Sequence, residues 1–173
     1  MMEFMEVLKG RRSVRKFKDR AVGKEIIEEL LKAAQMAPSA GNLQARDFII
    51  VTSKTTKQKL TKAALGQSFI EQAPVVIVAV ANIERSSRIY RSRGELYAAQ
   101  DAAAGIENLL LAAYSVGLGT CWIGAFDENA VRELLGIPDK TLPVAIIPVG
   151  YPDEQPAMPP RIAMERLVHQ ETW

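Results

Sequence analysis

Three arginines and a serine stand close together near the start of the chain, in the run Arg-Arg-Ser-Val-Arg at residues 11–15. A phosphate monoester carries about two negative charges and three strong acceptor oxygens, and planar guanidinium groups match such an anion with paired hydrogen bonds. Extended backbone places alternate residues on one side, so Arg12 is expected to point away from Arg11 and Ser13. Residues 1–24 also hold eight Lys and Arg against three Asp and Glu. We therefore expect an anion to bind here, and a solvated basic face is the alternative.

Two later stretches combine residue types that suit a flat polar ligand. Residues 37–44 read Ala-Pro-Ser-Ala-Gly-Asn-Leu-Gln, and the amides of Asn42 and Gln44 each offer donors and an acceptor to the edge of a heterocycle. Residues 117–126 hold three glycines within eight positions, which lets backbone N–H groups approach a ligand closely. The sequence contains neither the dinucleotide fingerprint G-x-G-x-x-G nor the P-loop motif. The alternatives are an ordinary polar turn and a glycine-rich connection from a helix to a strand.

The elements that must position these residues follow from hydrophobic spacing and from turn residues. Helical spacing predicts helices over residues 2–9, 23–36, 55–66, 95–116 and 127–136. Apolar runs rich in β-branched residues predict strands over residues 48–52, 75–80, 120–123 and 144–149. The helix over 95–116 is rich in alanine, which allows neighbouring elements to approach closely, so we expect it to be central. This mixture of helices and strands predicts an α/β or α+β fold.

The chain from Tyr151 onward differs from the rest. It holds four prolines within nine positions, from Pro152 to Pro160, which favours an extended path with little helix. Such an arm has few local partners, so we expect it to wrap a second subunit. A mobile tail is the alternative.

Length and composition limit the classes of protein that this chain can form. Its 173 residues, 48% hydrophobic and 24% charged, fit one compact domain over residues 1–173, with 151–173 as its arm. The net charge of +2 argues against non-specific binding of nucleic acid. The longest apolar run spans nine residues and about 20 are needed to cross a bilayer, so we expect no membrane partner. The chain does not begin with a secretory signal and has a single cysteine, so we expect a cytoplasmic protein.

Three single residues invite a chemical role that their context argues against. Cys121 has no second cysteine with which to form a redox pair, so we expect a small buried side chain. Trp122 is expected to lie in the core rather than to stack on a ligand. His169 is the only histidine and stands in the arm without other metal-ligating residues, so we expect no metal site.

Together, the motifs and their order resemble the FMN-dependent nitroreductase family. The resemblance rests on R-R-S-x-R, then A-P-S-A-G-N-L-Q, then D-A-A-A-G-I-E-N-L-L-L-A-A and G-L-G-T-C-W-I-G, and residues 160–161 and 165–169 extend it almost to the C-terminus. It implies an α+β fold of three layers, in which helices flank a mixed or antiparallel central sheet and one long helix is central. It also implies a homodimer with FMN at the subunit interface and a C-terminal arm that wraps the partner.

The resemblance also implies a reaction. Members of this family take a hydride from NADPH or NADH onto the flavin N5 and pass it to nitroaromatics, quinones or related small acceptors in a ping-pong cycle. The implied protein is an FMN-dependent NAD(P)H oxidoreductase with no catalytic side chain and no metal. Two alternatives stay open: a specialised flavoenzyme of the same fold (reductive dehalogenation, flavin fragmentation or azoline oxidation) and a flavin-binding dimer without turnover.

Twelve residues match positions that hold FMN in this family. The resemblance places Arg11 and Ser13 at the phosphate, with Arg12 nearby. It also returns Arg161 from the arm to the same phosphate. Arg15 is expected beside the ribityl chain and the N1/C2=O side of the ring, where a cation stabilises the reduced, anionic flavin.

The other matched residues are expected around the ring of the flavin. One set is expected to approach the flavin of the partner subunit: Pro38, Ser39, Asn42 and Gln44. Gln67 aligns loosely with a position that meets the pyrimidine edge. Ile123 and Gly124 are expected to bring backbone N–H groups to the N5 side.

Two stretches depart from the pattern of the family. Many relatives follow N-x-Q with Pro-Trp, whereas this chain has Ala45-Arg46, so the wall beside that loop is not assigned. Larger members carry a helical excursion before the central helix, but residues 82–95 are short here and hold four arginines, at positions 85, 88, 91 and 93. We expect an incomplete lid whose arginines favour anionic partners such as NADPH. A solvated basic helix face is the alternative.

Overall fold

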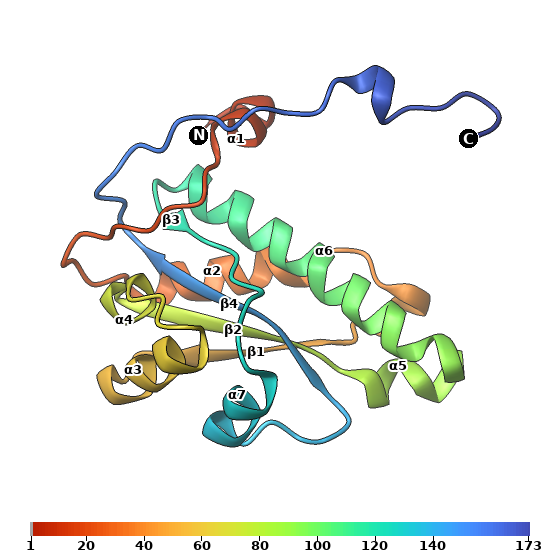
Figure 1. The fold of residues 1–173 in the computed structure, drawn as a ribbon, viewed down its shortest axis with the longest axis horizontal. Coiled ribbons are helices and arrows are strands. Elements are labelled where there is room, and N and C mark those ends of the chain that lie inside the picture. The colour runs from red at the N-terminus through yellow and green to blue at the C-terminus, as the bar shows by residue number, and fades with distance from the viewer. Residues whose placement is uncertain (1) are drawn as a thin grey trace.

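The computed structural model describes residues 2–173, and its centre is one sheet of four strands (Figure 1). The order across the sheet is β1 (Arg46–Val51), β2 (Val75–Ala81), β4 (Leu142–Gly150) and β3 (Gly119–Thr120). Every neighbouring pair of strands is antiparallel. β2 lies in the interior of the sheet, and it is apolar at all seven positions because both of its faces are covered.

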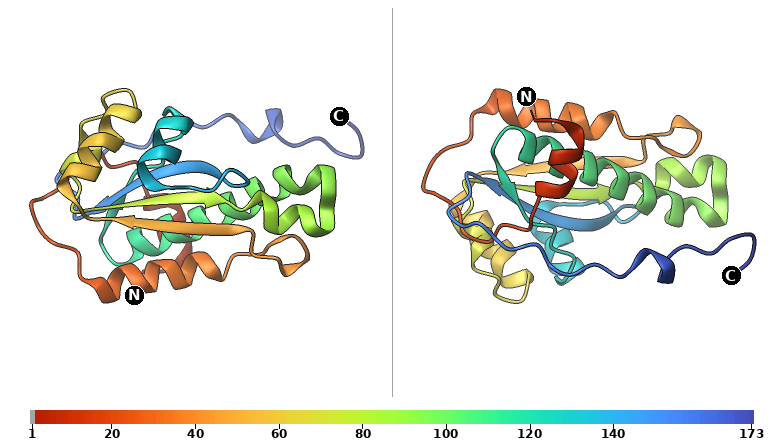
Figure 2. Two further views of the ribbon diagram at one scale, coloured as in Figure 1. Left: turned by 90° about the horizontal axis from the view of Figure 1, so that it is seen from below. Right: turned by 90° about the horizontal axis from the view of Figure 1, so that it is seen from above.

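Helices cover both faces of the sheet and give the molecule three layers (Figure 2). The helices on one face are α2 (Lys24–Gln35) and α6 (Gly94–Ser115), and those on the other are α3 (Lys54–Ala63), α4 (Phe69–Gln72) and α7 (Glu128–Leu135). Successive side chains of β2 point to opposite faces, so Ile77 joins the core beneath α2 and α6, and Val78 joins the other core. The predicted α+β fold of three layers is confirmed, and its sheet is purely antiparallel.

The long helix α6 is central to its layer, as its alanine content predicts, and spans 22 residues. Small buried side chains let the sheet and α2 pack closely against it. α1 (Phe4–Gly10) packs against the C-terminal end of α6, where Gly10 lies against Tyr114. At the N-terminal end, α5 (Ile83–Tyr90) and the 3-10 turn η2 (Arg91–Arg93) fold back against the helix. α6 therefore connects the two ends of the molecule.

Most helices and strands lie where the sequence predicts them, and the exceptions are local. The strand expected over 120–123 is a two-residue strand at Gly119–Thr120, followed by one isolated bridge between Ile123 and Ile146. Two helices, α4 and α5, are not predicted. The four residues of α4 are too few to show helical spacing, and α5 lies in the short stretch before the central helix for which no helix was predicted. Trp122 does not lie in the core, since it is 38% exposed.

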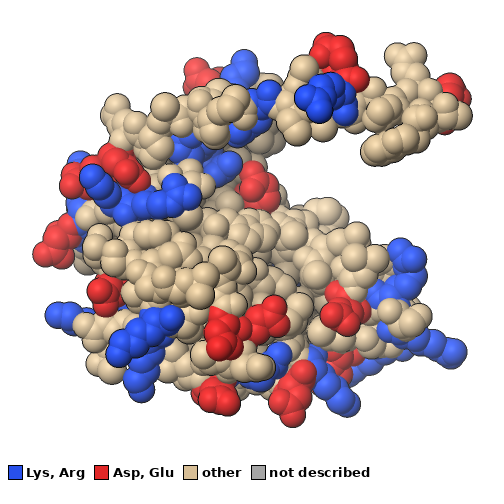
Figure 3. Space-filling model, viewed as in Figure 1, with Lys and Arg blue, Asp and Glu red and all other residues tan. Residues whose placement is uncertain are grey.

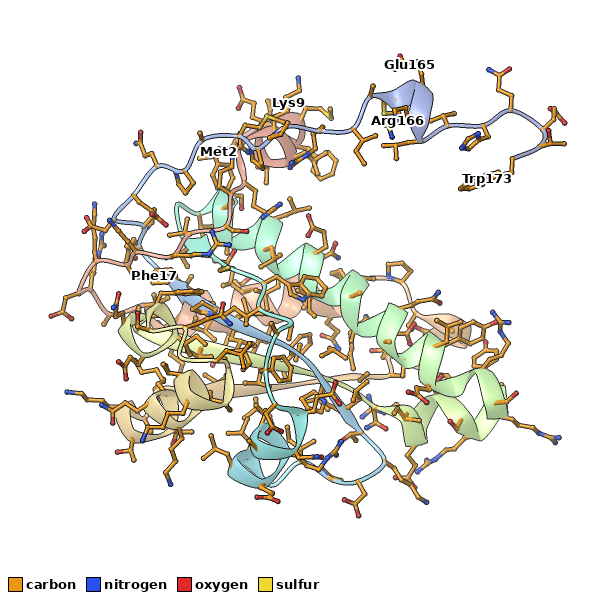
Figure 4. All side chains as sticks on the ribbon, viewed as in Figure 1. Met2, Lys9, Phe17, Glu165, Arg166 and Trp173 are labelled. Carbon is orange, nitrogen blue, oxygen red and sulfur yellow. The ribbon has the colours of Figure 1, made fainter. Side chains whose placement is uncertain are left out.

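From Tyr151 the chain leaves the sheet and runs as an extended arm past α1, interrupted by one 3-10 turn, η3 (Met164–Arg166) (Figure 1). This path confirms the prediction made from its prolines. The arm ends well away from the sheet, with Trp173 at its tip (Figure 4). Among residues 2–173, no helix is both long and apolar enough to cross a membrane.

Candidate functional site

The arginine run at residues 11–15 leaves α1 in extended form and lies beside β3. The Val14 N–H donates to the carbonyl of Thr120 at 2.8 Å, and Ser13 forms a parallel bridge with the same residue. This approach requires a glycine at position 119, because a Cβ there would lie 2.8 Å from Cβ of Val14. The glycine-rich stretch after α6 therefore seats the arginine run against the sheet.

The start of the arm pairs with the end of the arginine run. The Asp153 N–H donates to the carbonyl of Lys16 at 2.9 Å. Glu154 Oε1 then accepts from the N–H of Arg15 at 2.5 Å and from the N–H of Lys16 at 3.2 Å. These contacts turn the arm back over the arginines, so two segments from opposite ends of the chain lie side by side.

The two segments enclose a cavity of about 360 Å³, which we call the anion cradle. It is lined by Arg11, Arg12, Ser13 and Arg15 from the arginine run and by Pro156, Ala157, Pro159 and Arg161 from the arm. Figure 3 shows Lys and Arg side chains gathered near the base of the arm. Guanidinium groups and a hydroxyl are the donors that a phosphate takes, so this set of residues fits a phosphate ester. The structure thus brings five of the twelve predicted residues together.

The arginines of the anion cradle differ in how far they are already engaged. Arg12 donates from NH1 to two carbonyls at the C-terminal end of α1, at 2.7 Å each, and therefore caps that helix. Among residues 2–173, the one ion pair of Arg11 is loose, 3.8 Å from its Nε to Oε1 of Glu107. The guanidinium of Arg15 lies over the ring of Phe69, 5.9 Å from its centroid. Arg11 and Arg15 are therefore the better placed to hold an anion.

A second group of predicted residues lies on the stretch that follows β3. Gln67 donates from Nε2 to the carbonyl of Ala125 at 3.3 Å, which ties the connection before α4 to this stretch. The N–H and the carbonyl of Ile123 both pair with Ile146 at 3.0 Å, so this N–H is turned into the sheet. Gly124 is exposed, and within residues 2–173 its N–H makes no hydrogen bond. The sequence predicts two backbone N–H donors here, Ile123 and Gly124, and of these two only Gly124 has an N–H that is available to a ligand.

Cys121 lies behind the same stretch as a buried thiol, as predicted. Burial raises the pKa of this thiol above its ordinary value, although the guanidinium of Arg15 and a hydrogen bond with Ser13 oppose the shift. The thiol therefore stays protonated near neutral pH and is a poor nucleophile.

The remaining predicted residues lie on the 37–45 loop, which joins α2 to β1 and contains the 3-10 turn η1 (Ala40–Asn42). Within this loop, Ser39 Oγ accepts from the N–H of Gln44 at 3.0 Å. The loop contacts α6 at Asp101, whereas the cavities around Arg11 adjoin Tyr114, about 20 Å further along the helix. Figure 1 shows the two regions at opposite ends of α6. Four predicted residues therefore lie far from the anion cradle of their own chain: Pro38, Ser39, Asn42 and Gln44.

Three of the four arginines of the 82–95 segment have partners within the chain. Arg85 forms an ion pair with Asp47 at 2.8 Å. Arg88 pairs at 4.0 Å with a glutamate one helical turn earlier. Arg93 donates from Nε to the hydroxyl of Tyr97 at 2.8 Å. These contacts are intrahelical or with neighbouring elements, and they favour the alternative stated above, a solvated basic helix face, over a lid that holds its arginines out for a ligand.

Comparison with known proteins identifies the class to which this fold and site belong. The family model described as "Nitroreductase family" matches residues 8–68 and 61–151. The chain is 33% identical over 187 residues to the FMN reductase (NAD(P)H) of Bacillus subtilis, and the match covers 100% of this chain and 75% of the relative. The solved structure of NfrA2 from B. megaterium superposes with a TM-score of 0.93 at 31% identity, covering 100% of this chain and 76% of that one.

A further solved structure, the NADPH:FMN oxidoreductase from Vibrio harveyi complexed with NAD+, superposes with a TM-score of 0.92 at 28% identity. It covers 98% of this chain and 77% of that one. The chain belongs to the nitroreductase family, whose members are NAD(P)H/FMN oxidoreductases. The resemblance stated from the motifs is therefore confirmed.

Three residues beside the predicted site were not found from the sequence. Glu154 meets the arginine run only because the arm pairs with it, and no local pattern signals a pairing over such a separation. Phe69 supports Arg15 from α4, a helix that the spacing does not reveal. Trp122 has its indole nitrogen close to Gly124, on the exposed side of the stretch. The glycine at position 124 was the only feature of the sequence that pointed to a ligand near Trp122.

Proposed function

We propose that the chain is a single FMN-binding domain that forms a homodimer and transfers electrons from NADPH or NADH to nitroaromatics, quinones or related small acceptors. The observation that carries this proposal is the anion cradle, in which Arg11 and Ser13 from one end of the chain meet Arg161 from the other. Its donors suit the phosphate of FMN. The name of the V. harveyi relative, an NADPH:FMN oxidoreductase, is in line with this assignment.

The residues of the anion cradle have distinct tasks in this proposal. Arg11, Ser13 and Arg161 hold the phosphate and so fix FMN at its ribityl end. Arg15, supported by Phe69, places a cation beside the N1/C2=O side of the ring, where it stabilises negative charge. FMN, when bound, supplies hydride transfer at N5. The exposed N–H of Gly124 is the backbone donor that the chain offers on that side.

A second subunit is needed because the 37–45 loop lies far from the anion cradle of its own chain and does not reach a flavin bound there. We infer that this loop approaches the flavin of the partner. The arm supports the same pairing, since it carries a series of exposed apolar side chains: Met158, Ile162, Met164, Leu167, Val168 and Trp173. Burial of apolar surface contributes about 25 cal/mol per Å², so covering this series on a partner stabilises a dimer. Figure 4 shows the outer part of the arm, with Glu165, Arg166 and Trp173, reaching beyond α1.

The acceptor is proposed to be small and flat. Within residues 2–173, the cover before α6 is one short helix and a turn over residues 83–93, and three of its four arginines have partners within the chain. An open flavin face admits the nicotinamide first and then an acceptor in the same place. Positioning of the two partners in turn against N5 is therefore the main contribution of the protein.

The test is an absorption spectrum of the purified protein incubated with FMN, recorded before and after anaerobic addition of NADPH and then of NADH. We expect a protein-bound flavin band that at least one donor bleaches rapidly, and that a small quinone restores. A bound flavin that neither donor bleaches would refute the oxidoreductase assignment and favour a flavin-binding dimer without turnover. Failure to take up FMN would refute the role of the anion cradle itself.

A further inference from the structure

The 37–45 loop holds backbone conformations that side chains disfavour. Asn42 and Gln44 have φ of 55° and 50°, in the left-handed region, and Gly41, which lies within η1 just before Asn42, also has φ of 55°. Left-handed conformations of residues other than glycine persist where the surrounding structure over-determines them. Some set of contacts must therefore fix this loop, and the loop's own hydrogen bond from Gln44 to Ser39 is only one of them.

The first of these contacts is the side chain of Arg46, the residue that stands where many relatives have tryptophan. Arg46 is only 6% exposed, and its guanidinium reaches back beneath the loop. It donates to four backbone carbonyls: Gln35 at 3.0 Å, Ala37 at 2.6 Å, Pro38 at 3.2 Å and Asp101 at 3.2 Å. Burial lowers the pKa of this guanidinium, and the Asp101 carboxylate partly opposes that shift. The guanidinium of Arg46 thus holds the backbone that enters the loop through hydrogen bonds to its carbonyls.

The second contact is the carboxylate of Asp101 on α6, which is 4% exposed. Its Oδ1 accepts from the N–H of Ala40 at 3.0 Å, and its Oδ2 accepts from the N–H of Ala45 at 3.2 Å. These two residues flank the strained positions of the loop. Only a carboxylate presents an acceptor on both sides, because an amide of the same shape would turn an NH₂ group toward one of the two donors.

The third feature is Gly105, which lies one helical turn further along α6 and has no side chain. A Cβ at this position would lie 2.8 Å from Cδ of Arg46 and 3.2 Å from its Nε. Gly105 therefore provides the space in which the Arg46 side chain crosses α6. Asp101 and Gly105 lie four residues apart and so share one face of the helix.

We propose that Arg46, Asp101 and Gly105 form a buried clamp that positions the 37–45 loop for the flavin ring of the partner subunit. This proposal rests on the proposed function. The three residues touch no part of the flavin in it and act through the loop, so they are positioning residues. They set the position of Asn42 and Gln44, whereas the anion cradle of the other chain holds the phosphate independently.

Two variants disturb the clamp in different ways. Asp101→Asn keeps the shape of the side chain and removes one of its two acceptors. Gly105→Ala keeps all charged groups and displaces Arg46, and it also favours helix formation, so it tests the clamp even where Asp101→Asn is poorly folded. The matched control is Val131→Ala on α7, which removes buried apolar volume from the other core and leaves the loop unchanged.

The experiment measures Kd for FMN and for riboflavin, the visible absorption maximum of the bound flavin, and the thermal midpoint of each dimer. Riboflavin lacks the phosphate, so the ratio of the two Kd values reports on the anion cradle alone. We expect both clamp variants to weaken FMN and riboflavin equally, by about tenfold, with a shifted absorption maximum. Val131→Ala is expected to lower the thermal midpoint without either change.

Three results would overturn the proposal. The first is a clamp variant with a lower thermal midpoint but unchanged Kd values and an unchanged flavin spectrum, which would make the clamp purely structural. The second is a loss of affinity that Val131→Ala reproduces at equal destabilisation. The third is a wild-type protein that binds neither FMN nor riboflavin, and this result alone would also refute the proposed function.

Discussion

Replacing Arg11 by Gln tests most sharply whether the anion cradle binds the phosphate of FMN. The Arg11 side chain is 24% exposed, lines the cavity, and has one loose ion pair among the described residues, with Glu107 at 3.8 Å. Most of its donors are therefore available to a ligand. A hydrogen bond between charged groups contributes about 1.5–3 kcal/mol, which corresponds to a rise in Kd for FMN of roughly 10- to 150-fold. Loss of the partly exposed ion pair costs less than about 1 kcal/mol of stability, so the fold should survive.

The assay titrates wild type and variant with FMN and with riboflavin, and follows the quenching of flavin fluorescence. Because riboflavin has no phosphate, we expect its Kd to change by less than about threefold in Arg11→Gln. Lys18→Gln is the matched control, since it removes one positive charge from the same segment but from a side chain outside the cavity. Arg11 does not bind the phosphate if Arg11→Gln weakens FMN and riboflavin equally, or if Lys18→Gln weakens FMN as much.

Other outcomes follow from the same contacts. Above pH 9.0, the ordinary thiol pKa, an unfolded chain loses the Cys121 proton that the folded chain retains, so the free energy of unfolding should fall with rising pH. Urea unfolding of Cys121→Ala should show a shallower fall, and an identical slope would contradict the buried thiol. Arg88→Met should cost at most about 1 kcal/mol of stability and leave the KM for NADPH unchanged, because Arg88 pairs with Glu84 on its own helix; a raised KM would restore the lid hypothesis. Removal of residues 158–173 should yield a monomer by light scattering, and a persistent dimer would contradict the role of the arm.

The parts of the fold that the sequence predicts are those with a long repeating pattern. The alanines of α6 recur over 22 residues and the seven apolar residues of β2 are buried on both faces, so each pattern has one structural solution. β3 has only two residues, and its position depends on pairing with Val149 and Gly150, far away in the chain. α4 is a single turn. Elements this short are fixed by tertiary contacts, which local spacing does not report.

The candidate site also has a part that local motifs predict and a part that depends on tertiary contacts. Three motifs predict the family and the candidate residues by their residue types and their order: the arginine run, the 37–45 loop and the glycine-rich stretch. The sequence does not show that Glu154 pairs with the backbone of Arg15, because that contact depends on the return of the arm. Nor does it show that Arg46, the departure from the family pattern, is buried beneath the loop rather than exposed on its wall. A charged residue is ordinarily placed on the surface, and only its four carbonyl partners explain the exception.

We infer that each flavin site is built from the anion cradle of one chain and the 37–45 loop of the other. Arg11→Gln damages the cradle, and Asn42→Gly removes the loop amide while suiting the left-handed φ of 55° at that position. In a mixed dimer of the two variants, one site receives both lesions and the other receives neither.

The measurement is the FMN stoichiometry and NAD(P)H oxidation rate of this mixed dimer, purified through a different affinity tag on each chain. We predict one tightly bound FMN per dimer and about half of the wild-type rate, although each parent homodimer lacks an intact site. A mixed dimer with no tightly bound FMN would contradict the claim, because it would place the cradle and the loop at the same chain's flavin.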